Sequence, residues 1–367
     1  MRIGIDCRLW NESGVGRYIR NLVYNLQKLD EKNEYILFVL SKGHEKFKVQ
    51  SSKFKVKIAN VRWHTIAEQI GFSKVLNQEN LDLMHFPYFS VPLFYNRPFV
   101  VTIHDLIVNH FPTGQASTLP SLIYSLKLLS YKFIIGRAAK KAKKILTVSN
   151  ATKKEIVDHL KIKENKVVVT YEGVDNRISK IKNQKSKIDG KYFLYVGNAY
   201  PHKNLERLLE AFNILNADVN LILVGKEDYF YKRLKKKIIQ VNPSKKVIFL
   251  QNVSDQELSD LYKNALALVF PSLMEGFGLP ALEAMANKCL VLASDISALK
   301  EICADAAIYF NPADANDLVR KMQEIYPNDT YHYSDKKEKG LKRVKLFSWR
   351  KMAEQTLSVY EQSASKP

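Results

Sequence analysis

Two glutamates eight positions apart, Glu275 and Glu283, lie in the part of the chain best suited to chemistry. An apolar run typical of a β-strand, residues 265–270, precedes them, and Pro280 stands where a helix would begin. The N-terminus of a helix offers free backbone N–H groups to an anion such as a diphosphate, while carboxylates accept hydrogen bonds from sugar hydroxyls. This combination predicts a site for a nucleotide diphosphate sugar.

The residues from Glu275 to Glu283 closely resemble the Glu-x7-Glu signature of retaining glycosyltransferases with the GT-B fold, particularly family 4. The resemblance implies that Glu275 is catalytic and lies near the transferred sugar, and that Glu283 binds the nucleotide ribose. It also implies donor-binding roles for the residues between them: Gly276, Phe277, Gly278 and Leu279. The alternative is that both glutamates are ordinary surface acids beside a helix start.

A second donor-binding segment is expected at residues 197–204, which lead from a strand through a turn into an amphipathic helix. Lys203, at the start of that helix, would neutralise a diphosphate. The segment resembles the family's Gly-(Arg)-x-x-x-x-Lys-(Asn/Gly) motif. Asn198 stands where many relatives carry arginine, so this part of the cationic clamp is absent or supplied elsewhere, and Asn198 itself is assigned to donor binding. Lys226, after the next strand, is a further donor-binding candidate. The alternative is that Lys203 is a surface lysine at the start of a helix and binds no ligand.

In the first half of the chain, Gly14 and Gly16 follow the first expected strand and precede a helix. Glycines let the backbone approach a ligand closely, so that its N–H groups can face phosphate oxygens. By itself such a pair is often only a tight turn between strand and helix. Family 4 enzymes frequently have a similar loop near the donor phosphates, and the resemblance therefore implies that both glycines bind the donor.

His104 closes an expected buried strand in the sequence Thr-Ile-His-Asp. This sequence resembles the histidine-bearing strand end of the family, which lines the reacting sugar and the acceptor, and it implies a catalytic role for His104. The alternative is a structural histidine that is satisfied by a backbone carbonyl. His85, at the end of another strand, is a lesser candidate, and Ser149 is expected to cap a helix.

Length and patterning predict an α/β fold with two domains. The chain has 367 residues, more than one domain usually contains, and its hydrophobic content of 46% suffices for two cores. Short β-branched and aromatic runs alternate with longer amphipathic stretches, as in βα units around a parallel sheet. The expected strands lie near residues 2–6, 34–40, 55–61, 82–86, 99–103, 145–148, 167–171, 192–196, 219–224, 247–250, 265–270, 289–293 and 307–310. These elements predict two doubly wound, Rossmann-like domains, and the resemblance implies the GT-B arrangement, in which they face each other across a cleft.

The predicted domains are residues 1–178, on the acceptor side, and residues 191–345, which would bind the nucleotide sugar. Residues 179–190 between them are polar and without a usable period, which is typical of a linker. In the GT-B fold the last helix commonly returns to the first domain. Residues 346–367 are expected to form such a helix.

The net charge of +20 is unevenly distributed, because no acidic residue lies between Asp105 and Glu155. The basic residues of this region are expected to form a surface for an anionic membrane or acceptor: Lys127, Lys132, Arg137, Lys140, Lys141, Lys143 and Lys144. Apolar residues recur beside them at helical spacing: Leu119, Leu122, Leu126, Leu129 and Phe133. The alternative is that this stripe is simply the core-facing side of a helix.

Cysteine usage and hydropathy indicate a cytoplasmic protein. Cys7, Cys289 and Cys303 lie far apart, which suggests neither a disulfide framework nor a zinc site. No run of 18 uncharged apolar residues is present, which argues against a membrane span. The first residues resemble a buried strand more than a signal peptide. Together with the basic region, these features predict a location on the inner face of the plasma membrane, with peripheral attachment.

The predicted function is retaining transfer of a hexose from a nucleotide diphosphate sugar to a hydroxyl of a growing, lipid-linked surface glycan. Mannose from GDP-mannose is the first donor expected, because the Gly-Ile-Asp-x-Arg start and the His-Lys-Asn of the second domain are similar to O-antigen and capsule mannosyltransferases. UDP-glucose, UDP-galactose and rhamnose donors remain open. No cofactor or metal is expected, since the sequence has no Asp-x-Asp triplet and no cluster of histidine and cysteine with ligand spacing.

Two rival functions are kept. A sugar-nucleotide epimerase of the same fold would need no acceptor. A basic nucleic-acid-binding protein would explain the net charge, but the sequence contains no zinc finger, RNP motif or basic leucine zipper. No nucleic-acid partner is therefore expected.

Overall fold

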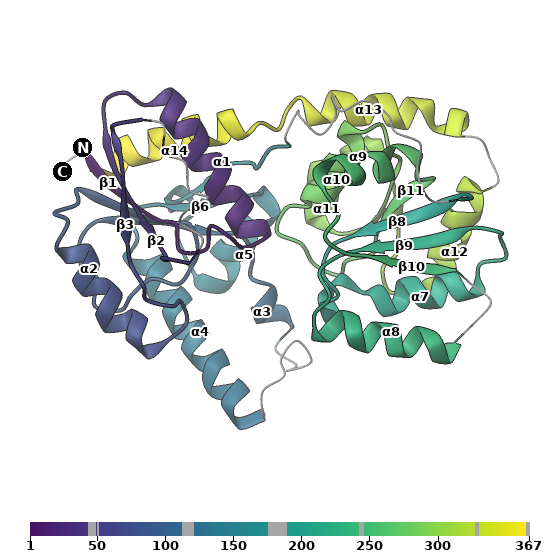
Figure 1. The fold of residues 1–367 in the computed structure, drawn as a ribbon, viewed down its shortest axis with the longest axis horizontal. Helices are drawn as coiled ribbons and strands as arrows, with labels where there is room; N and C mark the ends of the chain where they lie inside the picture. Colours follow the sequence, from purple (N-terminus) through teal and green to yellow (C-terminus); the bar gives the residue numbers. More distant parts are fainter. Residues whose placement is uncertain are drawn as a thin grey trace. The chain divides into compact units, whose positions relative to one another are not determined.

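The computed structural model describes residues 1–42, 49, 51–111, 121–174, 189–241, 246–326 and 330–364. The chain divides into two compact units, each with a parallel sheet covered by helices (Figure 1). Unit 1 comprises Met1–Glu172 and Ser348–Pro367, and unit 2 comprises Gly173–Phe347. Within the predicted linker, residues 179–188 lie outside the described part of the chain.

Unit 1 is built on a seven-stranded sheet in the order β3-β2-β1-β4-β5-β6-β7. All neighbouring strands are parallel: β1 (Arg2–Asp6), β2 (Glu34–Val39), β3 (Phe54–Ile58), β4 (Leu83–Phe86), β5 (Phe99–Ile103), β6 (Ile145–Thr147) and β7 (Val167–Val169). The central strands are continuous apolar runs because helices cover both of their faces. The strand order reverses between β1 and β4, and open α/β sheets bind ligands outside the carboxyl ends of the strands at such a point.

Helices cover both faces of this sheet (Figure 1). The described helices within residues 1–172 are α1 (Gly14–Leu29), the π-helical η2 (Glu68–Phe72), α2 (Ser73–Asn77), α3 (Ile107–His110), α4 (Ser121–Lys141), α5 (Asn150–Leu160) and the short η3 (Glu164–Lys166). On one face, Leu76, Ile135 and Ile156 join α2, α4 and α5 to a common apolar core. α1 packs on the other face.

The last helix, α14 (Trp349–Ala364), packs beside α1 in unit 1 and also contacts β4 and β5. Trp349 and Tyr360 are buried, and the Tyr360 hydroxyl lies 2.6 Å from Nδ1 of His85 on β4. The end of the chain is thus held to the sheet of unit 1 by packing and by a buried hydrogen bond.

Unit 2 has a six-stranded parallel sheet in the order β10-β9-β8-β11-β12-β13, which reverses between β8 and β11. The strands are β8 (Tyr192–Val196), β9 (Asn220–Val224), β10 (Val247–Leu250), β11 (Ala267–Phe270), β12 (Val291–Ser294) and β13 (Ala307–Phe310). Every strand expected from the sequence is therefore present in the two sheets. The α/β fold class is confirmed.

The helices of unit 2 form two layers (Figure 1). One layer contains α7 (Leu205–Ile214), α8 (Tyr229–Val241) and α12 (Ala315–Ile325). Apolar residues of these three helices join the strands in one hydrophobic core of unit 2. The other layer contains α9 (Asp255–Asn264), α10 (Leu279–Ala286), α11 (Ser297–Cys303) and α13 (Ser334–Val344). Short turns η4 (Pro201–Lys203), η5 (Ala304–Ala306) and η6 (Thr330–Tyr333) connect the elements. A capping box between Ser254 and Glu257 begins α9.

Candidate functional site

Lys203 and Glu275 lie on loops that follow adjacent strands of unit 2. β8 and β11 are neighbours at the point where the strand order reverses, so the segments after them emerge at one edge of the sheet. The segment after β8 carries Lys203, and the segment after β11 carries Glu275. The backbone N–H of Leu273 donates to the carbonyl of His202 at 2.8 Å, which joins the two loops.

Lys203 and Glu275 form an ion pair, with 2.5 Å between Nζ and Oε1. Their side chains are only 15% and 8% exposed, so solvent screens the pair less than it screens a surface pair. Asn204, in the left-handed conformation at φ 58°, donates its amide to the carbonyls of Pro271 and Pro312 at 3.0 and 2.8 Å. Asn204 thereby fixes the turn that presents Lys203, a role that sequence reasoning did not assign.

Two glycines allow the loops to approach closely. A Cβ on Gly225 would lie 2.2 Å from the carbonyl oxygen of Gly197, so only glycine fits after β9. Tyr231 donates its hydroxyl to the same carbonyl at 2.8 Å. Lys226 follows directly and is exposed, while Asn198 is half-buried and accepts the Tyr195 hydroxyl on its backbone oxygen.

Glu283 lies inside α10 and is 3% exposed. It accepts a hydrogen bond from the Tyr262 hydroxyl at 3.1 Å, and this second residue was not identified from the sequence. Gly278, at φ 111°, is the N-cap of α10, and Pro280 lies in its first turn, as the sequence predicts. The carboxylate therefore stands one turn into a helix that begins at the end of the Glu275 loop.

The residues between the two glutamates differ in their surroundings. Phe277 is 4% exposed and packs edge-to-face on Phe347, with 5.7 Å between ring centroids. Its side chain is therefore part of the packing of unit 2, and only its backbone is suited to meet a donor. Gly276 is buried, and Leu279 is half-buried at the start of α10.

In unit 1, His104 follows β5 and is held by two oxygen atoms. Its Nε2 lies 2.9 Å from the carbonyl of Pro87, and its Nδ1 lies 3.4 Å from Oε1 of Glu172. The Tyr18 ring meets the imidazole edge-to-face at 4.9 Å between centroids. Glu172 is 5% exposed and follows β7, so the fold brings an acid and a histidine together at one edge of the sheet. An acid directly after a strand was the signal that could have identified Glu172.

His85 is fully buried within the same unit. Its Nε2 lies 2.8 Å from the Thr102 hydroxyl, and its Nδ1 contacts Tyr360. Burial lowers the pKa of His85 to about 3, so the imidazole is neutral. These contacts make His85 a structural residue that ties α14 to the sheet.

Gly14 and Gly16 both lie in the first turn of α1. Gly14 is exposed, with open space around its Cα, and is placed to let a ligand approach the helix N-terminus. A Cβ on Gly16 would lie 2.7 Å from the Trp10 carbonyl, so Gly16 serves the packing of the preceding loop. Ser149 caps α5 by accepting the N–H of Thr152 at 3.1 Å, which confirms its predicted role.

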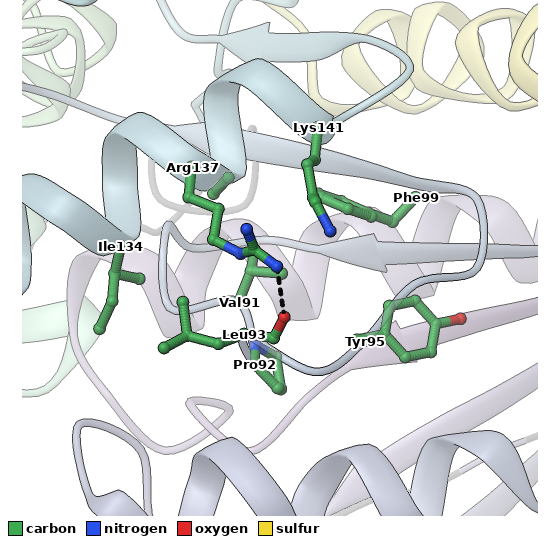
Figure 2. A pocket seen from close by; sticks show the side chains of 9 residues that line it. Val91, Pro92, Leu93, Tyr95, Phe99, Ile134, Arg137 and Lys141 are labelled. Carbon is green, nitrogen blue, oxygen red and sulfur yellow. Dashed lines mark hydrogen bonds between the residues drawn. The ribbon is translucent and has the colours of Figure 1, made fainter.

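The basic region after residue 120 divides into two parts. Lys127, Lys132, Lys140 and Lys143 are exposed. Arg137 and Lys141, labelled in Figure 2, line a pocket beneath α4. Its volume is about 10 Å³, close to the space of one water molecule. Arg137 donates to the Leu93 carbonyl at 3.0 Å, and Lys141 donates to Asn96 at 3.0 Å. Lys144 is half-buried and donates to the Asn165 carbonyl at 2.9 Å.

The apolar stripe of α4 faces solvent over much of its length. Leu126 is 58% exposed, Leu129 is 65% exposed and Phe133 is 60% exposed. The interpretation of this stripe as a core-facing side is therefore wrong for these three residues, because Ile135, Ala138 and Ala139 take the buried side of the helix. Leu119 and the side chain of Leu122 lie outside the described part of the chain. Among the described residues, none of the helices is both long and apolar enough to cross a membrane.

Comparisons with known proteins agree on one family across both units. The family model described as "Glycosyltransferase Family 4" matches residues 13–177, and that described as "Glycosyl transferases group 1" matches residues 176–343. The O-antigen chain mannosyltransferase RfbU of Salmonella typhimurium is 30% identical over 264 residues, which cover 72% of this chain and 70% of that protein. The O-antigen chain mannosyltransferase B of Escherichia coli is 27% identical over 292 residues, 76% of this chain and 74% of that protein.

Solved structures share the fold over nearly the whole chain. Sucrose-phosphate synthase from Thermosynechococcus elongatus matches with a TM-score of 0.79 at 19% identity, covering 99% of this chain and 98% of that one. WaaG, a glycosyltransferase involved in lipopolysaccharide biosynthesis, matches with a TM-score of 0.74 at 14% identity, covering 98% of this chain and 99% of that one. At these identities the likeness concerns the fold alone.

Proposed function

The chain belongs to the family 4 glycosyltransferases, which have the GT-B fold, and we propose that it transfers mannose from GDP-mannose to a hydroxyl of a growing, lipid-linked surface glycan with retention of configuration. The observation that carries the proposal is the ion pair of Lys203 with Glu275 at the strand-order reversal of unit 2, with Glu283 buried in the helix that follows the Glu275 loop. The choice of mannose rests on the two O-antigen mannosyltransferases to which the chain is similar.

Each of these residues suits one part of the donor. Lys203 would neutralise the diphosphate, since it is the cation of the ion pair at the end of β8. Glu283 would accept hydrogen bonds from the ribose hydroxyls, with Tyr262 orienting its carboxylate. Glu275 would face the transferred sugar.

The reaction would be driven mainly by electrostatic preorganisation. As the glycosidic bond breaks, negative charge grows on the diphosphate, and positive charge grows on a sugar that resembles an oxocarbenium ion. Lys203 and the N-terminus of α10 would stabilise the diphosphate without a metal ion. The acceptor hydroxyl would attack the same face of the sugar that the diphosphate leaves, and the leaving phosphate would help to take its proton. His104, oriented by Glu172, would contact the reacting sugar.

A donor panel tests the proposal directly. The purified protein is incubated with GDP-mannose, UDP-glucose, UDP-galactose or dTDP-rhamnose, and the release of free nucleotide is measured with Glu275→Gln as the background control. Release from GDP-mannose above that background and above the other donors is expected. Turnover confined to a UDP-sugar would refute the mannose assignment, and formation of a new sugar nucleotide without an acceptor would instead identify an epimerase.

The exposed face of α4 is the part suited to bring the enzyme to a lipid-linked acceptor. Leu126, Leu129 and Phe133 recur at i, i+3 and i+7 and so share one side of the helix, with Lys127 and Lys132 exposed beside them. Apolar side chains flanked by lysines match the acyl boundary and the phosphates of an anionic leaflet. This surface would hold the protein peripherally on the inner face of the plasma membrane, within the cytoplasm.

Co-sedimentation with vesicles tests this attachment. Binding should require phosphatidylglycerol in a phosphatidylcholine vesicle and weaken as salt rises. Each basic residue near such a surface contributes about 1 kcal/mol, so the double variant Lys127→Glu/Lys132→Glu should bind at least ~10-fold more weakly. Lys53→Glu/Lys55→Glu makes the same charge change at two exposed positions, one just before β3 and one on it, and is the matched control. Equal binding of both double variants, or equal binding to neutral vesicles, would exclude this surface.

A further inference from the structure

Two histidines and a glutamate of unit 1 converge on one point outside the residues assigned to glycosyl transfer. His110 ends α3, while Glu155 and His159 lie one turn apart on α5. Nε2 of His110 is 2.5 Å from Oε2 of Glu155, and Nε2 of His159 is 3.2 Å from the same oxygen. The ligand atoms of all three residues lie within 4.8 Å of one another.

This donor set is one that divalent transition metals accept. Imidazole nitrogen and carboxylate oxygen suit zinc, and three protein ligands leave a fourth tetrahedral position for water. With zinc–ligand bonds of about 2.0 to 2.1 Å, neighbouring ligand atoms in a tetrahedron stand about 3.3 Å apart. The separation of His159 from Glu155 already matches this value. The separation of His110 from Glu155 is shorter than this value, at 2.5 Å. The side chain of His110 is 34% exposed, so its ring has room to move outward until the separation fits.

We propose that His110, Glu155 and His159 form a binding site for a divalent transition-metal ion, with zinc as its best-suited occupant. The ion would clamp the end of α3 to the second half of α5. Because α3 begins three residues after His104, the clamp would also fix the backbone that follows the candidate catalytic histidine. None of these three residues belongs to the set proposed to bind the donor.

The sequence alone does not reveal this cluster. Glu155 and His159 have the spacing of one helical turn, but His110 lies 45 residues before Glu155 and is brought to it only by the packing of α3 beside α5. All three cysteines are buried, so they are poor competitors for the ion in the folded protein.

Zinc binding to the tag-free, metal-stripped full-length protein tests the site. Isothermal titration at neutral pH should give one zinc ion per chain. The variants His110→Ala, Glu155→Gln and His159→Ala should each weaken its Kd at least ~10-fold, since loss of even an outer partner of a metal ligand commonly has an effect of that size. The matched control is His332→Ala, which removes an exposed histidine of unit 2. Cobalt(II) offers a second readout, because a tetrahedral site gives it a visible absorption band that the three variants should lose.

Either of two results would overturn the proposal. The wild-type chain could take up no zinc, or the three variants could bind it with the affinity of the wild-type chain, which would place the ion elsewhere. Circular dichroism on each variant separates loss of the site from loss of the fold. Glu155→Gln keeps the shape of the side chain and a hydrogen-bond acceptor, so it removes the anionic ligand with little change to packing.

Discussion

Replacing Glu283 tests its proposed contact with the ribose most directly, because the side chain is buried and its surroundings are defined. In the substitution Glu283→Ala the Tyr262 hydroxyl, now 3.1 Å from Oε2, loses this acceptor. A neutral hydrogen bond contributes about 1 kcal/mol to stability and one to a charged group about 1.5 to 3 kcal/mol. The variant should therefore unfold at a lower temperature and yet remain folded under assay conditions.

The expected effect on the donor follows from the same values. Loss of a charge-assisted hydrogen bond to the ribose removes about 1.5 to 3 kcal/mol of binding free energy, and 1.4 kcal/mol is a tenfold change in Kd. The Kd for GDP-mannose should rise roughly tenfold to a hundredfold in Glu283→Ala. Glu283→Gln keeps an acceptor but loses the charge, so its Kd should lie between those of the alanine variant and the wild type. Tyr262→Phe should raise the Kd by a smaller factor of about 5, since it only frees the carboxylate to rotate.

Isothermal titration with GDP and with GDP-mannose measures these values without an acceptor. Glu324→Ala is the matched control, because Glu324 is an acid of unit 2 whose carboxylate, 43% exposed, pairs with Lys321. Thermal unfolding of every variant reports whether the protein is folded at the titration temperature. A folded Glu283→Ala with the donor Kd of the wild type would refute the ribose role, and the order alanine, glutamine, wild type is the pattern that supports it.

Three further predictions follow. Lys203→Ala should lower the rate of nucleotide release at saturating donor by roughly 100-fold, as loss of one transition-state donor commonly does, and Lys203→Arg should restore part of it; full turnover in the alanine variant would exclude the phosphate role. His104→Ala should lower turnover while leaving the Kd for GDP unchanged, and Glu172→Gln should show a weaker form of the same effect; a changed GDP affinity would point to a structural role instead. Burial lowers the pKa of His85 to about 3, so below about pH 6.5 the unfolded chain binds more protons than the folded chain does. The free energy of unfolding, measured by denaturant titration, should therefore fall by about 2 kcal/mol between pH 6.5 and pH 5. A free energy of unfolding that stays constant over this range would contradict a buried neutral His85.

Local pattern predicts the strands because each buried parallel strand is a short apolar run bounded by polar turns. Tyr192–Val196 and Ala267–Phe270 are such runs, and helix-start signals at Pro280 and Ser149 stand in the sequence itself. The edge at which Lys203 and Glu275 emerge also follows from the sequence, since carboxyl ends of parallel strands share one edge. These features depend on neighbours in the chain.

Pairs that depend on packing between distant segments could not be predicted in this way. Glu172 reaches His104 across two intervening strand–helix connections, and Tyr262 reaches Glu283 from a different helix. The sequence left the orientation of α4 open for a related reason. A periodic apolar stripe shows that a helix has an apolar side, but it does not show whether the protein itself covers that side, and here Leu129 remains 65% exposed.

The ion pair of Lys203 with Glu275 would affect how strongly Lys203 stabilises the bound donor relative to the transition state. The Lys203 ammonium lies 2.5 Å from the Glu275 carboxylate, so a diphosphate would have to compete with Glu275 for the same cation. The ground-state gain from Lys203 is then smaller than that of a lysine without a counter-ion. As the glycosidic bond breaks and charge moves onto the diphosphate, Lys203 would interact more strongly with the phosphate. Glu275 would then be released to face the positive charge that develops on the sugar. One pair of side chains would thus favour the transition state over the bound donor at both ends of the breaking bond. Glu275→Gln should separate these effects, because it should tighten GDP binding by freeing Lys203 and still lower turnover; weaker GDP binding in that variant would show that the pair does not compete with the donor.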